Sequence, residues 1–311
     1  MIFELTVLGC SSALPTSTKF PSAHVLNVHE RFFLIDCGEG TQIQIRKTKI
    51  KFGKINHIFI SHLHGDHVFG LFGILSTFNL LGRKTPLHIH AHPDMQHFMD
   101  FFRRYFAEEI SFNIELHALS KREIQLIYED KAVEVYAFPL KHRIPTFGFL
   151  FKEKKKPLNI KKEIVAGHKL SIQQVQDVKA GKDIQTEDGT ILQNREVTEP
   201  AYHRRSFAYC SDTAYYEKNI DFLKDIDLLY HEATFLDRDK QLAKITGHST
   251  ATQAATLAKK AGAKELLIGH FSNRYKNPDE FLLETREIFP ATRIANELET
   301  YAIPPTREAL K

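Results

Sequence analysis

The sequence predicts an α/β fold in which two β-rich halves pack face to face, with helices on the outside. The chain has 311 residues, of which 42% are hydrophobic and 24 are Phe, so it can bury a large core. Short apolar segments of strand length and longer helical segments both occur along it. Histidine or aspartate follows several of the apolar strands directly, at His62, His142, Asp212 and His270.

Composition limits the class of protein. The net charge of +4 is too small to indicate nucleic-acid binding by itself. Three widely spaced cysteines provide no disulfide framework and fit a reducing cytosol, so we expect a cytoplasmic protein. Met1–Leu8 lacks the basic start of a signal peptide, and no apolar run is long enough to span a bilayer. We therefore expect a protein that does not enter a membrane.

The first segments predict a small sheet. Ile2–Leu8 reads as a strand, and His24–Asn27 with Phe32–Asp36 reads as a hairpin. The two glycines of Cys37-Gly38-Glu39-Gly40-Thr41 fit a tight bend before the amphipathic stretch Gln42–Lys47. We interpret this glycine-containing segment as scaffold.

The stretch from His62 to His67 is the densest group of chemically active residues in the chain. A predicted strand and a predicted helix flank it, at Ile55–Ile60 and Val68–Leu81. His62 and His64 are two apart and share a face of extended chain, so they can converge on one ion. Asp66 and His67 follow where the chain begins to coil, which suggests a second ion beside the first. Imidazole and carboxylate are ligands of Zn²⁺, and paired ions can activate water for hydrolysis.

The alternative is that this turn only caps a helix, since 17 histidines make chance clustering less surprising. The strand-to-helix context favours a catalytic metal motif. His88, His90 and His92 alternate along a further predicted strand, Pro86–His92, and could in principle bind metal. No obvious partner follows later in the chain, so we interpret them as structural or solvent-facing.

The remaining elements follow the same patterns. Asp94–Phe106 is predicted to be a helix that buries Phe98, Phe101, Phe102 and Tyr105. The expected strands are Glu123–Tyr128, Ala132–Phe138, Ile144–Phe151, Ser206–Ser211, Ile226–Tyr230 and Glu265–Gly269. Ala251–Ala261 is a predicted helix that Ser249 or Thr250 can cap and Gly262 ends, and Asn277-Pro278 opens another.

The H-x-H-x-D-H string at His62–His67 resembles the metallo-β-lactamase superfamily, whose fold is a four-layer αββα sandwich. Additional segments narrow the resemblance to ribonuclease Z and extend it over nearly the whole chain. These segments are Asp36–Gln42, the stretch that begins Lys141-His142-Arg143, Tyr209–Thr213, His231-Glu232-Ala233-Thr234, His248-Ser249-Thr250 and His270-Phe271-Ser272.

The resemblance implies two Zn²⁺ ions per subunit, although Mn²⁺, Co²⁺ or Fe²⁺ also suit such ligands. It assigns His62, His64 and His142 to one ion and Asp66, His67 and His270 to the other, with Asp212 as the bridge. Asp66 would also accept a proton from the attacking water. His248 would donate a proton to the departing oxygen, and Glu232 would orient the His248 ring.

Lys152–Gly189 differs in composition from the rest of the chain, with nine lysines and few aromatic residues. The lysines are Lys152, Lys154, Lys155, Lys156, Lys161, Lys162, Lys169, Lys179 and Lys182. Such a run is most often a solvated insertion. It can also bind RNA phosphates without reading their sequence. Ribonuclease Z carries a substrate-binding arm here, although the glycine-proline tip of the family is absent. We expect one domain over 1–311 with an arm inserted at 152–189.

The resemblance implies an endoribonuclease that removes the 3′ trailer from precursor tRNA. It would cut after the discriminator nucleotide and leave a 3′-hydroxyl on the tRNA and a 5′-phosphate on the trailer. A homodimer is expected, in which the arm of one subunit holds tRNA for the other. The alternatives are a small-molecule phosphodiesterase or thioesterase of the same fold, or a metal-free RNA-binding homologue. The filled ligand positions argue against the last.

Overall fold

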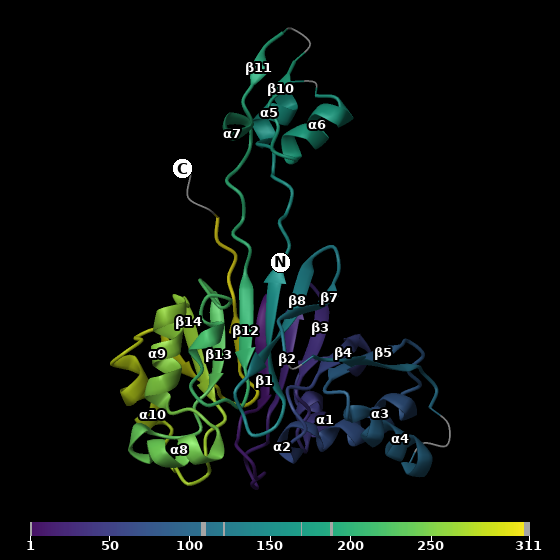
Figure 1. The fold of residues 1–311 in the computed structure, drawn as a ribbon. Helices are drawn as coiled ribbons and strands as arrows, with labels where there is room; N and C mark the ends of the chain where they lie inside the picture. Colours follow the sequence, from purple (N-terminus) through teal and green to yellow (C-terminus); the bar gives the residue numbers. More distant parts are fainter. Residues whose placement is uncertain (1, 107–109, 121, 169, 187–188, 308–311) are drawn as a thin grey trace. The chain divides into compact units, whose positions relative to one another are not determined.

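A computed structural model describes residues 2–106, 110–120, 122–168, 170–186 and 189–307 (Figure 1). Contacts divide these residues into two compact units. The first contains residues 2–152 and 206–303, and the second contains 153–205 and 304–307. No helix in the described ranges combines the length and the apolar character needed to cross a bilayer.

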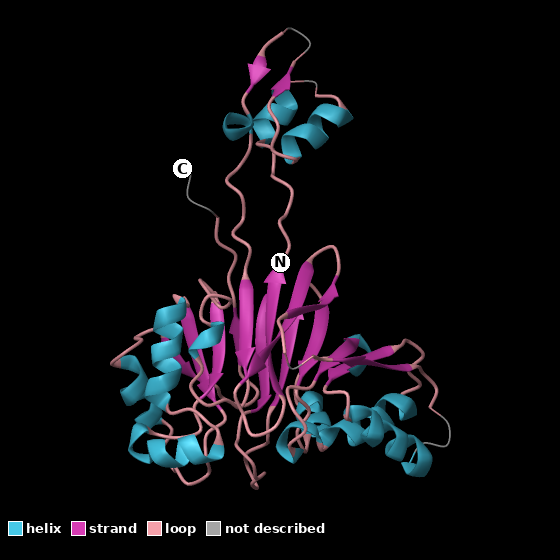
Figure 2. Cartoon of the chain, in the orientation of Figure 1, coloured by secondary structure: helices cyan, strands magenta, loops and turns pink. Residues whose placement is uncertain are grey.

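The first unit contains two large mixed sheets (Figure 2). In the first sheet β1, β2 and β3 pair antiparallel, and β3 to β6 pair parallel. Its strands are, in spatial order, β16 (Thr300–Ala302), β1 (Phe3–Gly9), β2 (Ala23–Val28), β3 (Arg31–Ile35), β4 (Ile55–Phe59), β5 (Leu87–Ala91) and β6 (Ile114–Ala118).

The second sheet repeats this plan with strands from later in the chain. Strands β12 to β15 pair parallel, and β9 joins β12 antiparallel. Its spatial order is β15 (Thr292–Ile294), β14 (Glu265–Gly269), β13 (Leu228–Glu232), β12 (Ser206–Cys210), β9 (Thr146–Glu153), β8 (Val133–Leu140) and β7 (Gln125–Glu129).

Three apolar clusters hold these layers together. One lies between the sheets and combines residues of both, including Phe33, Phe59, Phe149 and Tyr209. The second packs one group of helices on the outer face of the first sheet, and the third packs another group on the outer face of the second sheet. The helices of these two groups are α1 (Thr41–Arg46), α2 (Gly65–Val68), α3 (Gly70–Leu80) and α4 (Met95–Phe106), then α8 (Lys240–Thr246), α9 (Ala251–Ala261) and α10 (Asp279–Arg286). The predicted four-layer αββα arrangement is confirmed.

The second unit has a small apolar core of its own. Val178, Ile184 and Val197 are buried, and four partly buried aliphatic side chains pack on them. Its elements are α5 (Lys162–Gly167), α6 (Ile172–Lys179), β10 (Ile184–Gln185), β11 (Ile191–Leu192) and α7 (Asn194–Val197). The unit extends past Gly189 to Arg205. Three residues of the lysine-rich segment lie outside the described residues, namely Lys169, Glu187 and Asp188.

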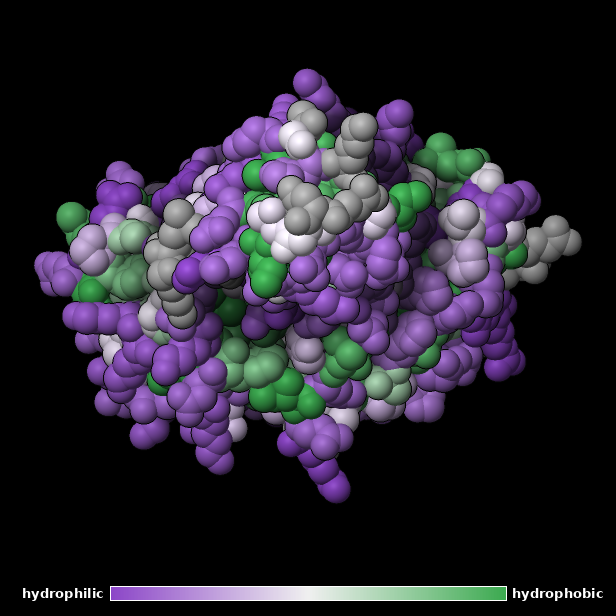
Figure 3. All heavy atoms as spheres, turned by 90° about the horizontal axis from the view of Figure 1, so that it is seen from above, coloured by the Kyte–Doolittle hydropathy of each residue, from purple (hydrophilic) through white to green (hydrophobic). Residues whose placement is uncertain are grey.

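Hydrophilic residues predominate on the face drawn in Figure 3, and the hydrophobic ones form separate patches. One prediction about burial was wrong. Phe101 and Tyr105 of α4 are 54% and 60% exposed, although both were expected to be buried. The helix instead buries Met95, Met99 and Phe102, whose spacing of four and three places them on one stripe.

The short strand β6, the helix α8 and the strands β15 and β16 were not predicted. Helix α9, by contrast, has the predicted bounds. Thr250 accepts a hydrogen bond from Gln253 N in a capping box, and Gly262 ends the helix with a φ of 65°. The three cysteines are free and buried, as the absence of a disulfide pattern predicted.

Candidate active site

The carboxyl ends of parallel strands from both sheets deliver the candidate residues. Asp36 follows β3, His62 follows β4, Asp212 follows β12, and His270 follows β14. Strands that run parallel end at the same edge of a sheet, so residues far apart in sequence meet there. Two of these residues, Asp36 and His270, have φ values of 56° and 61°. Non-glycine residues rarely adopt this left-handed backbone, and such strain concentrates at functional sites.

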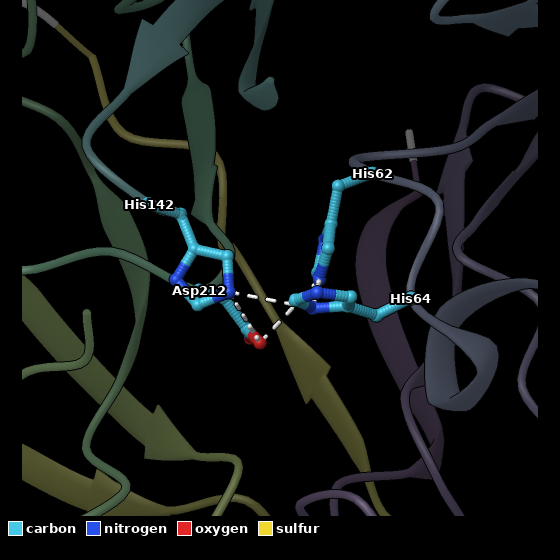
Figure 4. A group of neighbouring side chains, drawn as sticks. All are labelled: His62, His64, His142 and Asp212. Atoms are coloured by element: carbon cyan, nitrogen blue, oxygen red, sulfur yellow. Dashed lines mark hydrogen bonds and ion pairs between the residues drawn. The ribbon is translucent and has the colours of Figure 1, made fainter. Parts of the chain in front are cut away.

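One group of donors is formed by His62, His64, His142 and Asp212, whose ligand atoms all lie within 4.8 Å of one another. Figure 4 shows these side chains pointing toward one another from different parts of the chain. His62 Nε2 lies 3.0 Å from His64 Nδ1 and 3.5 Å from Asp212 Oδ2. His142 Nε2 lies 3.3 Å from the same His64 nitrogen. The structure thus brings four of the predicted ligands to one point.

A second group joins Asp66, His67 and His270, again within 4.8 Å. The other oxygen of Asp212, Oδ1, lies 3.4 Å from His67 Nε2 and 3.3 Å from His270 Nε2. His67 and His270 also approach Asp66 Oδ2, at 3.7 and 3.5 Å. Asp212 therefore turns one oxygen to each group, which is the arrangement of a carboxylate able to bridge two cations.

The donor set passes a test of its fit to metal ions. His67 Nε2, His270 Nε2 and Asp212 Oδ1 are buried and form no hydrogen bond with any described residue. Buried polar atoms without partners are costly, so their convergence needs an explanation. Cations among them satisfy all three atoms at once. Neutral imidazole and carboxylate are also the donors that Zn²⁺ takes.

The far nitrogens of His142 and His270 are held by the protein. His142 Nδ1 donates to the carbonyl of Gly247 at 2.7 Å, and Gly247 has a φ of 76°, a conformation that suits glycine. His270 Nδ1 lies 2.9 Å from Thr234 Oγ1, whose hydroxyl donates to Glu232. Each bond leaves Nε2 of the same ring with its lone pair directed to the cluster, which pre-sets the tautomer.

Asp36 supports His67 and Ser61 in the same manner. Its Oδ2 accepts from His67 Nδ1 at 2.8 Å and from Tyr209 Oη at 2.8 Å, and its Oδ1 accepts from Ser61 N at 2.7 Å. Burial would raise the pKa of the Asp36 carboxyl, but the charge of His67 and these hydrogen bonds lower it. Burial opposes the charged form of His67, yet Asp212, Asp36 and Asp66 raise the pKa of that imidazole well above its usual value, and a cation bound at Nε2 would take the place of this proton.

Glu232 and His248 form a pair beside the donors. His248 Nδ1 lies 3.0 Å from Glu232 Oε1, which also accepts from the backbone N–H groups of Thr213 and Ser249. Burial would lower the pKa of His248, but the charge and hydrogen bond of Glu232 outweigh it and raise the pKa to about 9. The imidazole is held in a fixed orientation, as a proton donor requires.

A cleft of about 450 Å³ opens onto these groups. Asp66, Asp212, His248 and His270 line it, together with the exposed ring of Phe69. Ala13 N also donates to Asp66 Oδ2 at 2.9 Å, which fixes the carboxylate at the edge of the cleft. A substrate in this space would contact the donors of both groups.

Comparisons with known proteins show the family of this chain. Two family models match, one described as Anti-Pycsar protein Apyc1 over residues 3–154 and one described as the β-lactamase superfamily domain over residues 196–271. The chain is 45% identical to "Ribonuclease Z" of Bacteroides thetaiotaomicron over 95% of its own length and 93% of that relative. The chain belongs to the ribonuclease Z family. It is 43% identical to the Bacteroides fragilis member, over 95% of this chain and 97% of that one.

Solved structures support the same assignment. The human tRNase Z, short form, superposes with a TM-score of 0.71 at 29% identity, over 97% of this chain and 99% of that one. The metallo-β-lactamase fold protein YhfI from Bacillus subtilis gives a TM-score of 0.69 at 18% identity, over 97% of this chain and 100% of that one, which supports the fold alone. As a member of the ribonuclease Z family, the chain is a hydrolase of phosphodiester bonds with a metallo-β-lactamase fold.

Within the ribonuclease Z site, sequence reasoning missed Asp36, Thr234 and the carbonyl of Gly247 as supports of the histidines. All three lie in segments that the sequence marked for other reasons. Asp36 ends the strand before the histidine strand, and β3 pairs parallel with β4. A lone carboxylate at the end of a neighbouring parallel strand is the signal that could have identified it.

Proposed function

We propose that this protein is a zinc-dependent endoribonuclease that removes the 3′ trailer from precursor tRNA. The cut follows the discriminator nucleotide and leaves a 3′-hydroxyl on the tRNA and a 5′-phosphate on the trailer. The observation that carries the proposal is Asp212, whose two oxygens face two separate groups of donors at one cleft. Membership of the ribonuclease Z family supports the choice of substrate.

His62, His64 and His142 would hold one ion, Asp66, His67 and His270 the other, and Asp212 both. Bound there, the ions supply Lewis acidity toward the scissile phosphate and make water reactive at neutral pH. Zinc suits the donors best, and Mn²⁺, Co²⁺ or Fe²⁺ would also suit them. The hydrogen bonds to the far nitrogens keep the rings in place before substrate arrives.

The protein's own groups move the protons. Asp66 lines the cleft with one carboxylate oxygen fixed by Ala13 N, so it can accept a proton from the attacking water. His248 also lines the cleft and is held at Nδ1 by Glu232, so it can protonate the oxygen that departs. Glu232 is a positioning residue, since it is fully buried and acts through His248.

The second unit would hold the tRNA. Lys155, Lys156 and Lys179 border a shallow hollow of about 450 Å³ within this unit. Their ammonium groups offer contacts to phosphates without sequence readout. We extend the proposal to a homodimer in which the arm of one subunit holds tRNA for the site of the other. We also propose a cytoplasmic location, which the three free cysteines support.

The proposal is tested with a trailer-bearing precursor tRNA. The untagged protein should release an intact trailer in one cut after the discriminator nucleotide, and the cut is mapped by sequencing both products. A chelator should abolish cleavage, and added Zn²⁺ should restore it. Sedimentation at the concentration of the assay tests the homodimer, which a wholly monomeric protein would rule out.

Two results would overturn the proposal. Undiminished cleavage after the metals have been removed would exclude the proposed use of the donor groups. No cleavage of precursor tRNA, with rapid turnover of a small phosphodiester or a thioester, would instead favour a small-molecule hydrolase of the same fold.

A further inference from the structure

A second cluster of histidines lies on the first sheet, away from the cleft. Strands β4, β5 and β6 run parallel, with His57 opposite His88, His88 opposite Glu115, and His90 opposite His117. Residues opposite one another in a sheet point to the same face, so these side chains gather there. The opposite face of β5 is apolar and packs on helices. None of these residues lines the cleft or belongs to its two donor groups.

Three side chains of this cluster meet closely. His88 Nδ1 lies 3.0 Å from His117 Nε2 and 3.2 Å from Glu115 Oε2. Donors around a tetrahedral zinc ion, with bonds of about 2.0–2.1 Å, lie roughly 3.4 Å apart. The two distances from His88 Nδ1 are therefore near the spacing that one ion requires, and the ligand atoms of all three residues lie within 4.8 Å of one another. The sequence had not indicated partners for His88, because β6, which carries Glu115 and His117, was not predicted.

The neighbouring imidazole rings stack on two of the three side chains. His57 stacks on His88 with ring centroids 4.7 Å apart, and His90 stacks on His117 at 4.6 Å. His90 Nδ1 is also buried without a hydrogen-bond partner among the described residues.

Stacked imidazoles on a sheet can be purely structural, and that explains His57 and His90. A hydrogen bond explains either contact of His88 Nδ1 by itself, but this nitrogen carries at most one proton and faces both His117 Nε2 and Glu115 Oε2. Glu115 also accepts from Asn113 Nδ2 through its other oxygen, which leaves Oε2 directed to His88. Two imidazoles and one carboxylate form the protein donor set of many zinc sites with an open position.

We propose that His88, Glu115 and His117 form a further metal site, which binds one divalent transition-metal ion such as Zn²⁺. The protein supplies three donors, and water or a donor from another molecule completes the coordination. The side chains of Glu115 and His88 are 41% and 27% exposed, so the ion is accessible from solvent. Binding should be weaker than at the cleft, because this exposure leaves the donors less firmly held than His67 and His142, whose far nitrogens are fixed by hydrogen bonds.

The test measures zinc stoichiometry in the untagged, 311-residue protein. Equilibrium dialysis against a zinc buffer, followed by elemental analysis, should give one more equivalent per chain for the wild type than for His117→Ala or Glu115→Gln. The matched control is His92→Ala, because His92 follows the same strand but pairs with Asp94 at 3.4 Å, outside the cluster. This control should keep the additional equivalent.

Thermal unfolding provides an independent readout. Added Zn²⁺ should raise the melting temperature of the protein with a loaded cleft, and the increase should be lost in Glu115→Gln, which keeps the size of the side chain. Trailer cleavage by either variant should stay within about twofold of the wild type. Equal zinc content in the wild type, Glu115→Gln and His117→Ala would overturn the proposal.

Discussion

The donor groups at the cleft and the lysines of the second unit differ in how their charges are placed. At the cleft most of the charged and polar groups are buried, and His67, His142 and His270 are each fixed by a hydrogen bond to another segment of the chain. In the second unit Lys155 and Lys179 are exposed, and neither pairs with a carboxylate of a described residue. Buried groups give exact geometry, whereas exposed ammonium groups give a diffuse attraction that salt screens.

The supporting cores differ as well. The donor groups rest on three extensive apolar clusters, whereas the apolar core of the second unit has three buried side chains among its described residues, Val178, Ile184 and Val197. At about 1.5–3 kcal/mol for each buried side chain, such a core stabilises a small fold only modestly. The donor groups therefore lie in the unit with the larger core. The second unit, with its small core, suits binding that does not require fixed side-chain positions.

The largest effect is expected for Asp212→Ala. This change removes the carboxylate that faces both donor groups, so zinc content should fall and trailer cleavage should drop by about a thousandfold or more. The control is Asp221→Ala, which changes an exposed aspartate between β12 and β13 and should behave as the wild type. A fully active Asp212→Ala protein would show that cleavage does not require the buried carboxylate that faces both donor groups.

A smaller loss is expected for Asp36→Asn. The amide keeps the shape of the side chain but removes the charge beside His67 and one acceptor atom of the network. Outer supports of this kind are typically worth about 10- to 100-fold in metal affinity or activity. The control Asp94→Asn alters the partner of His92 and should have no such effect. If both variants cleave alike, the hydrogen bond to His67 has no role in the site.

The smallest effect is expected for the double variant Lys155→Ala/Lys179→Ala. Binding of precursor tRNA should weaken several-fold, and the slope of log affinity against log salt should fall by about 0.7–0.9 for each phosphate that is no longer neutralised. Turnover of a small phosphodiester should not change. Lys161→Ala serves as the comparison, since the Lys161 ammonium donates to the carbonyl of Glu196 at 2.7 Å. An unchanged slope of log affinity against log salt would show that these two lysines do not neutralise tRNA phosphates.

The sequence predicted those parts of the molecule whose signals are local. The histidine motif, the strand ends at Asp212 and His270, and the capped helix α9 all follow from patterns within a few residues. The resemblance to ribonuclease Z segments then predicted which of these residues bind the metal ions. Periodicity also identified most strands of both sheets, because their apolar residues face a helix layer or the opposite sheet.

Features that depend on register could not be predicted in the same way. Asp36 reaches His67 only because β3 and β4 pair in parallel, and His117 reaches His88 only because β6 joins β5. The segment that forms β6, Ile114–Ala118, alternates apolar and polar residues, a strand pattern that was overlooked in the sequence. The lysine-rich segment is mostly polar, so its composition did not indicate a core. That core forms when residues separated in sequence, such as Val178 and Val197, pack together.

The two points at which the chain enters and leaves residues 153–205 lie next to each other, which matters for engineering the chain. Lys152 and Ser206 are partners in the antiparallel pair of β9 and β12, so the polypeptide leaves the sheet and re-enters it at adjacent positions. Just beyond them, Arg205 Nη2 pairs with Glu153 Oε1 at 2.8 Å, and both side chains are buried. A short hairpin turn could therefore replace residues 153–205 in a single excision that takes the ion pair away with its unit. The sheet would keep its strand order, so a minimal hydrolase lacking this appendage is a realistic engineering goal.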